Sequence, residues 1–436
     1  MATLFKDVFI LDGEREAAQK GHLLVSKGRI QSVLDISENP PAADKVVEGK
    51  GHMAVLPGFV NAHTHAAMVL LRGLGEGAPL MEWLQKKIWP VEAKLTPELI
   101  YRGTASAILE MLATGTTCFA DMYFEMEVVA KAALEAGMRA ALCRGIVGGP
   151  PVDGISKIDR SIEDNLGLFE RWHGREGLLT VQLGPHAPYT VPIDDMKKIV
   201  NIAKERGIGL HFHFLETEWE LGYIRDELKM EPDAYLREVG IFDAPGVVLA
   251  HGVWMNPMWA EADAIDMSQA TIVHNPGSNM KLGSGVMPLD AWLDKNVGLA
   301  LGTDGASSNN RLDMWGEMRS AALLHKGTTC NPSSVPALDV LRMATFEGAR
   351  AFGFANKGLI QEGWVADLVL VDLDQPHYVG VNEENLVGYI VYAGSSADVK
   401  GTMVNGKWLY RDGAYPGLDK EEIVRRAREA RTELTR

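Results

Sequence analysis

The stretch that decides the fold is Val55-Leu56-Pro57-Gly58-Phe59-Val60-Asn61-Ala62-His63-Thr64-His65, an apolar run that ends in two histidines. The apolar residues 55–60 are typical of a buried strand. Side chains two positions apart on a strand point to the same side, so His63 and His65 are expected to face one common space. Imidazole nitrogens at such a place suit zinc, iron or nickel. A lone His-x-His is a weak signal, so the rest of the chain decides whether it marks a metal site.

Seven similar runs follow along the chain, separated by stretches with a helical pattern of apolar residues. The predicted strands after residues 55–60 are 117–121, 139–145, 179–184, 209–214, 247–251, 271–274 and 298–304. The predicted helices between them include 97–113, 125–136, 192–205 and 311–325. Strands that alternate with helices in this way predict an α/β fold, a closed (β/α)8 TIM-like barrel. The alternative is an open doubly wound sheet, but no Gly-x-Gly-x-x-Gly motif follows an early strand.

Both ends of the chain read as short strands and turns. The strand patterns cover residues 4–11, 21–26, 29–34, 358–360, 366–372, 389–393 and 401–410. Lys27-Gly28 and Asn405-Gly406 are hairpin turn signals within them. We therefore predict two domains, a small composite β-sandwich of residues 1–56 plus 358–436 and a metal-dependent barrel of residues 57–357.

Polar side chains end several of the predicted barrel strands, which is where barrel enzymes place their sites. His213 ends strand five, His251 ends strand six and Asp304 ends strand eight. Three imidazoles and one carboxylate would leave a position for water, as in catalytic metal sites. His211 has the same parity as His213 but lies one layer deeper, so we expect it to pack in the core. The expected metal ligands are His63, His65, His213 and Asp304.

The same residue types predict hydrolytic chemistry. A divalent metal lowers the pKa of a bound water towards about 7. His251 is then better used as a base beside this water than as a further ligand. Asp304 has two oxygens, so it can bind the metal and also accept a proton. Glu216, three residues after His213, is expected to donate a proton to the substrate. Zinc is the expected metal, with iron, manganese or nickel as alternatives.

Composition and charge exclude several other classes of protein. The chain has 436 residues, of which 46% are hydrophobic and 23% charged, as in a globular enzyme. We expect a cytoplasmic protein without a membrane partner, because no apolar run is long enough for a span and the first residues lack a signal peptide pattern. The three cysteines form no Cys-x-x-Cys pair, which fits a reducing compartment. A net charge of −15 argues against a nucleic-acid partner.

Two segments resemble a known family. Residues 57–65, Pro-Gly-Phe-Val-Asn-Ala-His-Thr-His, and residues 302–310, Gly-Thr-Asp-Gly-Ala-Ser-Ser-Asn-Asn, resemble the amidohydrolase superfamily, specifically its 5′-methylthioadenosine/S-adenosylhomocysteine deaminases. The likeness spans nearly the whole chain and includes residues 81–84, 89–92, 184–189, 274–282 and 363–369. Members of the superfamily with two metals usually carry a modified lysine on strand four. Residues 181–186 contain no lysine, so one metal is expected.

The resemblance implies roles for further residues. It makes Glu216 and His251 the proton-transfer residues and implies that Glu92 binds ribose hydroxyls, with Trp83 packing nearby. It also implies that Arg144 and His186 line the ribose and 5′-substituent region. Residues 148–153 form a longer segment than the family pattern has, which leaves open whether Arg160 supplies a second substrate arginine. A homo-oligomer is a further expectation from the resemblance.

The expected activity is hydrolytic deamination at adenine C6. The substrates would be 5′-methylthioadenosine, S-adenosylhomocysteine or adenosine, and the products the inosine derivative and ammonia. Glu216 would protonate N1 and Asp304 would pass a proton to the leaving ammonia. The alternatives are a chlorohydrolase or triazine-type hydrolase, or another purine or pyrimidine deaminase, on the same scaffold. An inactive binding or scaffold relative is a more remote alternative, because such relatives usually lose metal ligands.

Overall fold

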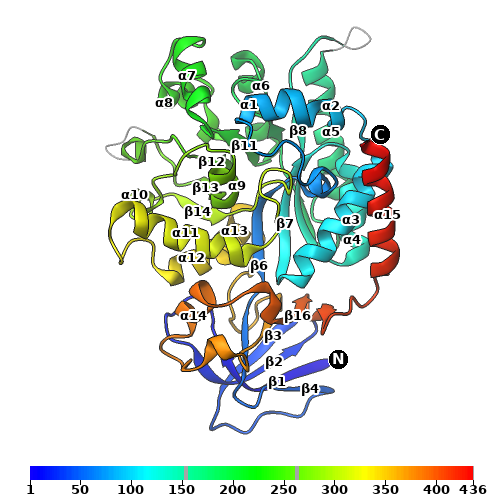
Figure 1. The fold of residues 1–436 in the computed structure, drawn as a ribbon, viewed down its shortest axis with the longest axis vertical. Coiled ribbons are helices and arrows are strands. Elements are labelled where there is room, and N and C mark those ends of the chain that lie inside the picture. The colour runs from blue at the N-terminus through cyan, green and yellow to red at the C-terminus, as the bar shows by residue number, and fades with distance from the viewer. Residues whose placement is uncertain (152–155, 261–264, 436) are drawn as a thin grey trace.

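Parallel strands form the wall of a barrel in the computed structural model, which describes residues 1–151, 156–260 and 265–435 (Figure 1). Strands β9 and β10 both pair with β8 and lie one after the other along the chain, so they share one of eight positions in the wall. The wall strands are β6 (Phe59–Thr64), β7 (Thr116–Tyr123), β8 (Arg139–Ile146), β9 (Leu179–Val181), β10 (Gly184–Pro185), β11 (Leu210–Phe214), β12 (Val247–His251), β13 (Ala270–His274) and β14 (Gly298–Leu301).

The wall closes on itself at two seams. A parallel bridge between Leu183 and Leu210 joins the first group of strands to β11. On the other side, the N–H of Asp304 donates to the carbonyl of His63 at 2.9 Å, which joins the segment after β14 to β6. The predicted closed barrel is therefore confirmed, and the open doubly wound sheet is wrong.

The predicted first strand, residues 55–60, is divided between two sheets. β5 (Met53–Pro57) belongs to a sheet built from the chain termini, and β6 begins only at Phe59. Gly58 lies at the crossing, where a Cβ would come within 2.3 Å of the Thr117 side chain. Because only glycine fits such a close approach, the chain can pass from one sheet to the other at this point.

Helices cover the outside of the barrel (Figure 1). The long ones lie close to the predicted positions, because apolar residues on one face of each pack against the wall. They are α3 (Pro97–Ala113), α4 (Met126–Ala136), α5 (Lys157–Trp172), α6 (Ile193–Arg206) and α11 (Met314–Thr329). Shorter helices are α1 (Leu80–Trp83), α2 (Trp89–Glu92), α7 (Glu218–Asp226), α8 (Pro232–Glu238), α9 (Pro276–Lys281), α10 (Leu289–Trp292), α12 (Ala337–Met343) and α13 (Phe346–Ala351).

Short segments of other helix types connect these elements. Among the described residues, six are 3-10 segments and one, η2, is a π-helical turn that joins α1 to α2. They are η1 (Ala66–Leu71), η2 (Leu84–Ile88), η3 (Arg175–Gly177), η4 (Ile241–Asp243), η5 (Pro257–Ala260), η6 (Pro376–Tyr378) and η7 (Ser396–Asp398).

Strands from both termini form one eight-stranded sheet below the barrel (Figure 1). Its order is β17-β16-β15-β5-β1-β2-β3, and β4 pairs with β1. All of these strands are hydrogen-bonded into a single sheet, so the predicted sandwich arrangement stays a prediction. Besides β5, the strands are β1 (Ala2–Ile10), β2 (Gln19–Ser26), β3 (Arg29–Asp35), β4 (Lys45–Glu48), β15 (Leu368–Asp372), β16 (Val399–Val404) and β17 (Lys407–Arg411).

Three predictions for the C-terminal part are wrong or incomplete. Residues 389–393 were expected as a strand, but they lie in or just after helix α14 (Leu386–Tyr392). Residues 386, 387, 390 and 391 are buried, which is a helical rather than a strand spacing. Residues 358–360 form no strand. Helix α15 (Lys420–Leu434) was assigned with the β-domain but packs against α3 of the barrel, so the two-domain division at residue 358 stays a prediction.

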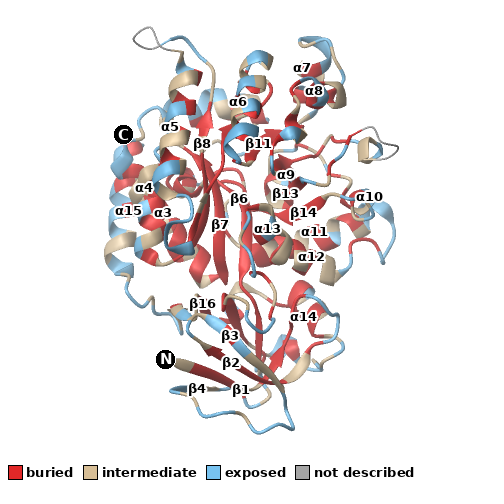
Figure 2. Cartoon of the chain, turned by 180° about the vertical axis from the view of Figure 1, so that it is seen from behind, coloured by how far each residue is buried: buried red, intermediate tan, exposed pale blue. Residues whose placement is uncertain are grey.

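Buried residues fill the barrel wall and the inner face of the terminal sheet, and exposed residues gather on the outer helix faces (Figure 2). Cys118 and Cys143 are buried free thiols, and Cys330 is an exposed one. In the described part of the chain, no helix is both long and apolar enough to cross a membrane.

A buried group of ions joins the barrel to the terminal sheet. Arg139 Nε lies 2.6 Å from Asp367 Oδ2, and Lys357 Nζ lies 3.0 Å from the same oxygen. The N–H of Asn405 donates to Asp367 Oδ1 at 2.8 Å. Burial acts to raise the pKa of Asp367, but Lys357 and Arg139 outweigh it and lower the pKa to about 2. A carboxylate held by two buried cations is costly to remove, because the cations are left without a counter-charge.

We expect Asp367→Asn to lower the free energy of unfolding by about 3–5 kcal/mol, measured by urea denaturation. The folded pKa of about 2 lies below the unfolded value of about 3.9. The contribution is therefore present in full above about pH 5 and is lost as the pH falls towards 2. The control is Asp243→Asn, which breaks a pair with Lys204 whose side chains are each 58% exposed, and should cost less than about 1 kcal/mol. Equal losses in both variants would contradict the prediction.

Candidate functional site

A cavity of about 350 Å³ lies at the carboxyl ends of the barrel strands. Its lining brings together residues at or just after the ends of seven strands, β6, β7, β8, β10, β11, β12 and β14, and residues from the segment between β6 and α3. One end is lined by His65, His213, Glu216, His251 and Asp304. The cavity therefore lies at the face of the barrel where such enzymes carry out their chemistry.

The predicted ligands converge at this end of the cavity. His65 Nε2 lies 3.1 Å from Asp304 Oδ1, and His63 Nε2 lies 3.5 Å from the same oxygen. His213 Nε2 lies 3.4 Å from His65 Nε2. Two groups have ligand atoms within 4.8 Å of one another, the first being His63, His65 and His213 and the second His63, His251 and Asp304.

Hydrogen bonds on the far side of each ring leave Nε2 facing the centre. His65 Nδ1 lies 2.5 Å from the carbonyl oxygen of Met122, and His213 Nδ1 lies 2.9 Å from that of His186. A carbonyl only accepts, so each Nδ1 carries the proton and each Nε2 presents a lone pair. This tautomer is the one found in metal-bound histidines.

The spacing of these residues fits one divalent ion with a further position for water. Ligand atoms held about 2.1 Å from one ion in a four- or five-coordinate site lie about 3.0–3.6 Å apart, and the observed separations of 3.1–3.5 Å fall in this range. The Nε2 atom of His63 is buried and has no hydrogen-bond partner among the described residues. Lone pairs facing each other at these distances are stabilised by a cation between them.

Two serines orient Asp304, and residue-by-residue reading of the sequence missed both. Ser278 Oγ and Ser308 Oγ each donate to Asp304 Oδ2 at 2.7 Å, which leaves Oδ1 on the side of the histidines. Ser278 comes from α9 and Ser308 from the loop after β14. Both serines lie inside segments that carry the family resemblance, and this resemblance is the signal that could have indicated them.

Three strand-end residues of the site have a backbone conformation that is unfavourable for side chains other than glycine. Leu215, His251 and Asp304 have φ values of 52°, 77° and 61°. Such residues cost about 1–3 kcal/mol each and persist where the surroundings hold them, often at functional sites. Their presence after β11, β12 and β14 therefore marks the same end of the barrel as the ligands do.

Glu216 and His251 lie beside the ligands. Glu216 Oε2 is 3.9 Å from His251 Nε2. Both side chains are buried, and burial raises the pKa of Glu216. His251 Nδ1 lies 2.9 Å from Asn279 Oδ1, so Nδ1 donates and Nε2 faces Glu216. His211 lies beneath, with Nε2 at 2.9 Å from His63 Nδ1, and burial lowers its pKa to about 3.

The substrate residues implied by the resemblance are only partly brought together. Trp83, Glu92 and His186 line the same cavity. Glu92 Oε1 accepts from the hydroxyl of Tyr123 at 2.6 Å, and burial raises the pKa of Glu92. Trp83 Nε1 donates to the carbonyl of Leu74 at 3.0 Å, so this ring is held in place from behind. Burial lowers the pKa of His186 to about 4.

Arg144 lines a neighbouring cavity of about 320 Å³ that shares Glu92 with the first. Its Nε lies 3.3 Å from Asp164 Oδ2, and its Nη1 donates to Ser161 Oγ at 3.0 Å. Arg160 lies on α5 outside the set of described residues that line the main cavity, whereas Lys157 of the same helix belongs to it. Of the longer segment 148–153, residues 152 and 153 lie outside the described residues. Substrate contacts of the two arginines stay predictions.

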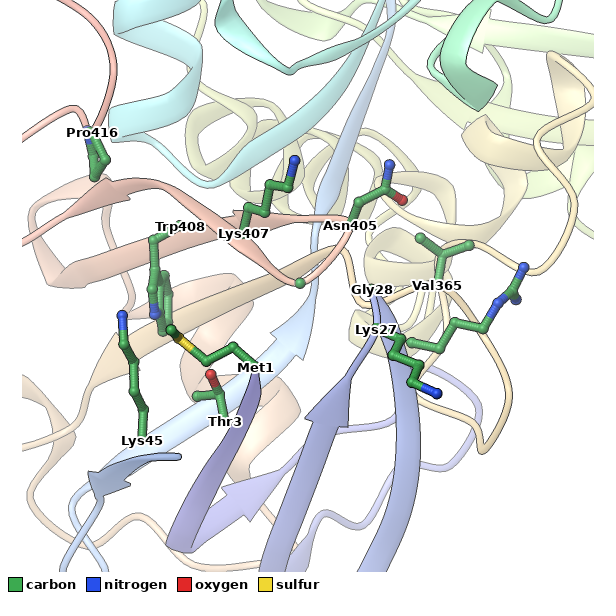
Figure 3. A pocket seen from close by; sticks show the side chains of 12 residues that line it. Met1, Thr3, Lys27, Gly28, Lys45, Val365, Asn405, Lys407, Trp408 and Pro416 are labelled. Atoms are coloured by element: carbon green, nitrogen blue, oxygen red, sulfur yellow. The ribbon is translucent and has the colours of Figure 1, made fainter. Parts of the chain in front are cut away.

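A larger hollow of about 740 Å³ lies on the terminal sheet, away from these residues (Figure 3). It is lined by several cations, but the amino groups of Lys27, Lys45 and Lys407 lie apart and do not point toward one another. Side chains that do not converge cannot bind one small ligand together. The cavity at the barrel end is therefore the candidate active site.

Comparison with known proteins shows the family of the chain. A model of the amidohydrolase family matches residues 54–409. A 5-methylthioadenosine/S-adenosylhomocysteine deaminase from Pelotomaculum thermopropionicum is 42% identical over 96% of this chain and 95% of its own length. A 5′-deoxyadenosine deaminase from Methanosarcina mazei is 38% identical over 99% and 98%.

Solved structures give the same result. An adenosine deaminase from Xanthomonas campestris with bound zinc superimposes with a TM-score of 0.92, at 32% identity over 99% of this chain and 98% of that one. An atrazine chlorohydrolase from Arthrobacter aurescens complexed with zinc has a TM-score of 0.87 at 24% identity over 98% and 100%, which shows a shared fold alone. The chain thus belongs to the amidohydrolase family and, within it, to the 5-methylthioadenosine/S-adenosylhomocysteine deaminases that its residues 57–65 and 302–310 resemble.

Proposed function

We propose that the protein removes the 6-amino group of adenosine derivatives with a 5′ substituent, giving the inosine derivative and ammonia. It is a hydrolase that acts on the C–N bond of a cyclic amidine, as its family relationship supports. One observation carries the choice of a nucleoside: a single cavity is lined by Glu216 and His251 beside the convergent histidines and Asp304, and also by the half-buried carboxylate of Glu92. Such a cavity can bind a base and its sugar at the same time.

A divalent metal belongs to this site, as the convergent ligand set and the similar adenosine deaminase with bound zinc support. We propose that it is one zinc ion held by His63, His65, His213 and Asp304. Three nitrogens and one oxygen suit zinc, although iron, manganese or nickel accept the same ligands. When bound, the ion supplies Lewis acidity that activates water at neutral pH.

Three side chains move protons in the proposed reaction. His251 accepts a proton from the attacking water at Nε2, because Nδ1 is held by Asn279. Glu216 donates a proton to N1 of the adenine ring. Asp304 passes the remaining water proton to the amine as it leaves. The raised pKa of Glu216, which burial produces, suits a carboxyl group that must hold a proton near neutral pH.

Glu92 is the proposed ribose residue. Tyr123 occupies Oε1, while Oε2 has no hydrogen-bond partner among the described residues. A carboxylate oxygen that lines a cavity can accept further hydrogen bonds, and a pair of neighbouring hydroxyls can donate them. The 2′- and 3′-hydroxyls of a nucleoside form such a pair.

The ribose assignment predicts discrimination against missing hydroxyls. 2′-Deoxyadenosine should show a kcat/KM roughly 10–150-fold below that of adenosine, since charge-assisted hydrogen bonds contribute about 1.5–3 kcal/mol. Glu92→Gln should remove most of this difference and leave the metal content unchanged. The matched control is Glu82→Gln in the exposed neighbouring helix, which should discriminate as the wild type does. If wild-type enzyme treats the two nucleosides alike, the role of Glu92 is wrong.

The function itself is tested by following products from a substrate panel. 5′-Methylthioadenosine, S-adenosylhomocysteine and adenosine should release ammonia, and chlorinated triazines should release no chloride. Chloride release without ammonia would favour the chlorohydrolase alternative. Ammonia release from free guanine or cytosine, and not from nucleosides, would favour another deaminase. A cytoplasmic location and a homo-oligomeric state stay predictions.

A further inference from the structure

The turn that carries Glu216 adopts a conformation that it cannot favour by itself. β11 ends at Phe214, Leu215 follows with φ of 52°, and α7 begins at Glu218 after Glu216 and Thr217. Leu215 is fully buried, and a leucine in the left-handed region is strained. The position of Glu216 therefore depends on contacts that hold this turn.

The carboxylate of Glu220 supplies two of these contacts. Its Oε1 accepts from the N–H of Leu215 at 2.9 Å, and its Oε2 accepts from the N–H of Glu216 at 3.1 Å. In an ordinary capping box this glutamate would bind the N–H of the N-cap residue, which is Thr217 here. Glu220 instead reaches one and two residues further back, onto the turn itself. Its side chain is only 1% exposed, so water does not compete for these bonds.

The other side of the turn is tied to the segment after His251. The carbonyl of Leu215 accepts from the N–H of Trp254 at 3.0 Å, and that of Phe214 accepts from Gly252 at 3.1 Å. The turn is thus held between α7 and the segment that follows β12, the strand that ends at His251 (Figure 1). These contacts together set the 3.9 Å separation between Glu216 and His251.

We propose that Glu220 is a positioning residue for the deamination, acting through the backbone of Leu215 and Glu216 to aim the Glu216 carboxyl at the substrate. This inference rests on the proposed function. A carboxylate suits the place because both of its oxygens accept, whereas a glutamine has one accepting oxygen and an NH₂ group that would face an N–H. Burial acts to raise the pKa of Glu220, and the two N–H groups, which favour the ionised form, act against that shift.

The decisive experiment is a double-mutant cycle of Glu220→Gln with Glu216→Gln, using metal-loaded full-length enzyme and adenosine. Alone, Glu220→Gln should lower kcat roughly 10–100-fold, with KM and metal content within about threefold of the wild type. In the Glu216→Gln background it should lower kcat by less than about threefold, because the group it positions is already lost. Equal losses in both backgrounds, or a parallel loss of metal, would overturn the proposal.

Two more variants separate positioning from helix stability. Thr217→Ala removes the hydroxyl that accepts from the N–H of Glu220 at 3.3 Å, but leaves the two bonds to the turn. It should lower the melting temperature and keep kcat within about threefold. Glu220→Asp keeps both oxygens at a shorter reach, so its kcat should lie between those of the wild type and Glu220→Gln.

If Glu220→Gln does not fold, the aspartate variant decides: a lowered kcat at unchanged KM supports the proposal, and wild-type kcat overturns it. Failure of the proposed function has a different signature, because the wild type itself would then release no ammonia. Wild-type kcat in Glu220→Gln beside an impaired Glu216→Gln would overturn the positioning role alone.

Discussion

Glu216→Gln is expected to lower kcat for adenosine deamination by about 10²–10⁴-fold, the usual contribution of a general acid. Glutamine keeps the size of the side chain but has no proton to give to N1. Glu216 is buried 3.9 Å from His251, so no solvent-exposed acid can take over its role at the same place. Metal content should be unchanged, since Glu216 lies outside the ligand set.

The measurement is steady-state kinetics with metal analysis of the same preparation. Glu218→Gln is the matched control, because it makes the same substitution two residues away on the exposed start of α7 and should keep wild-type kcat. Turnover of Glu216→Gln within threefold of the wild type would remove Glu216 from the mechanism. A large loss of metal in this variant would instead make Glu216 a ligand or a support for one.

The barrel could be predicted from the sequence because its signal is periodic. Runs such as residues 247–251 and 271–274 are short, β-branched and separated by helical patterns, and they correspond to β12 and β13. The prediction failed where periodicity is ambiguous. Residues 389–393 contain β-branched and aromatic residues that suit a strand, but the chain buries one face of a helix there instead.

The convergence of His63, His65, His213 and Asp304 could be predicted because strand parity and strand ends constrain the direction of side chains. His63 and His65 face one space because side chains two positions apart on a strand point to the same side. The support around them could not be predicted in this way. Ser278, Ser308 and Glu220 reach the site through α9, a loop and α7, whose paths are set by packing rather than by a repeat.

Arg144 shows the limit of reasoning from position alone. It lies near the end of β8, where barrel enzymes place functional residues, and this placement was foreseen. Its long side chain can turn in several directions, and it pairs with Asp164 of α5 beside the cavity. The pairing depends on how α5 packs, which no local pattern encodes.

Removing the divalent metal should lower kcat for deamination by about 10³-fold or more, because Lewis-acid activation lowers the reaction barrier by several kcal/mol. The prediction is checked by dialysis against a chelator, followed by titration with zinc, iron, manganese or nickel. Restored kcat at one ion per chain supports a single-metal site. Recovery that requires two ions would contradict the single-metal prediction, which follows from the absence of lysine in residues 181–186.

Metal removal should also destabilise the fold, and this effect can be read without any substrate. The proposed ligands include His63, whose Nε2 is buried without a partner among the described residues, and Asp304, whose Oδ1 lies 3.1 Å from His65 Nε2. Without the ion these groups lose their stabilising partner, and an ion that binds the native state alone raises the free energy of unfolding. The apo-enzyme should therefore melt at a lower temperature, with zinc restoring the difference. Ser278→Ala should lower the affinity for zinc by about 10–100-fold, because it removes a hydrogen-bond donor that orients Asp304. The stabilisation by a given concentration of zinc should then be smaller. A melting temperature that does not respond to zinc would contradict the assignment of these residues as ligands.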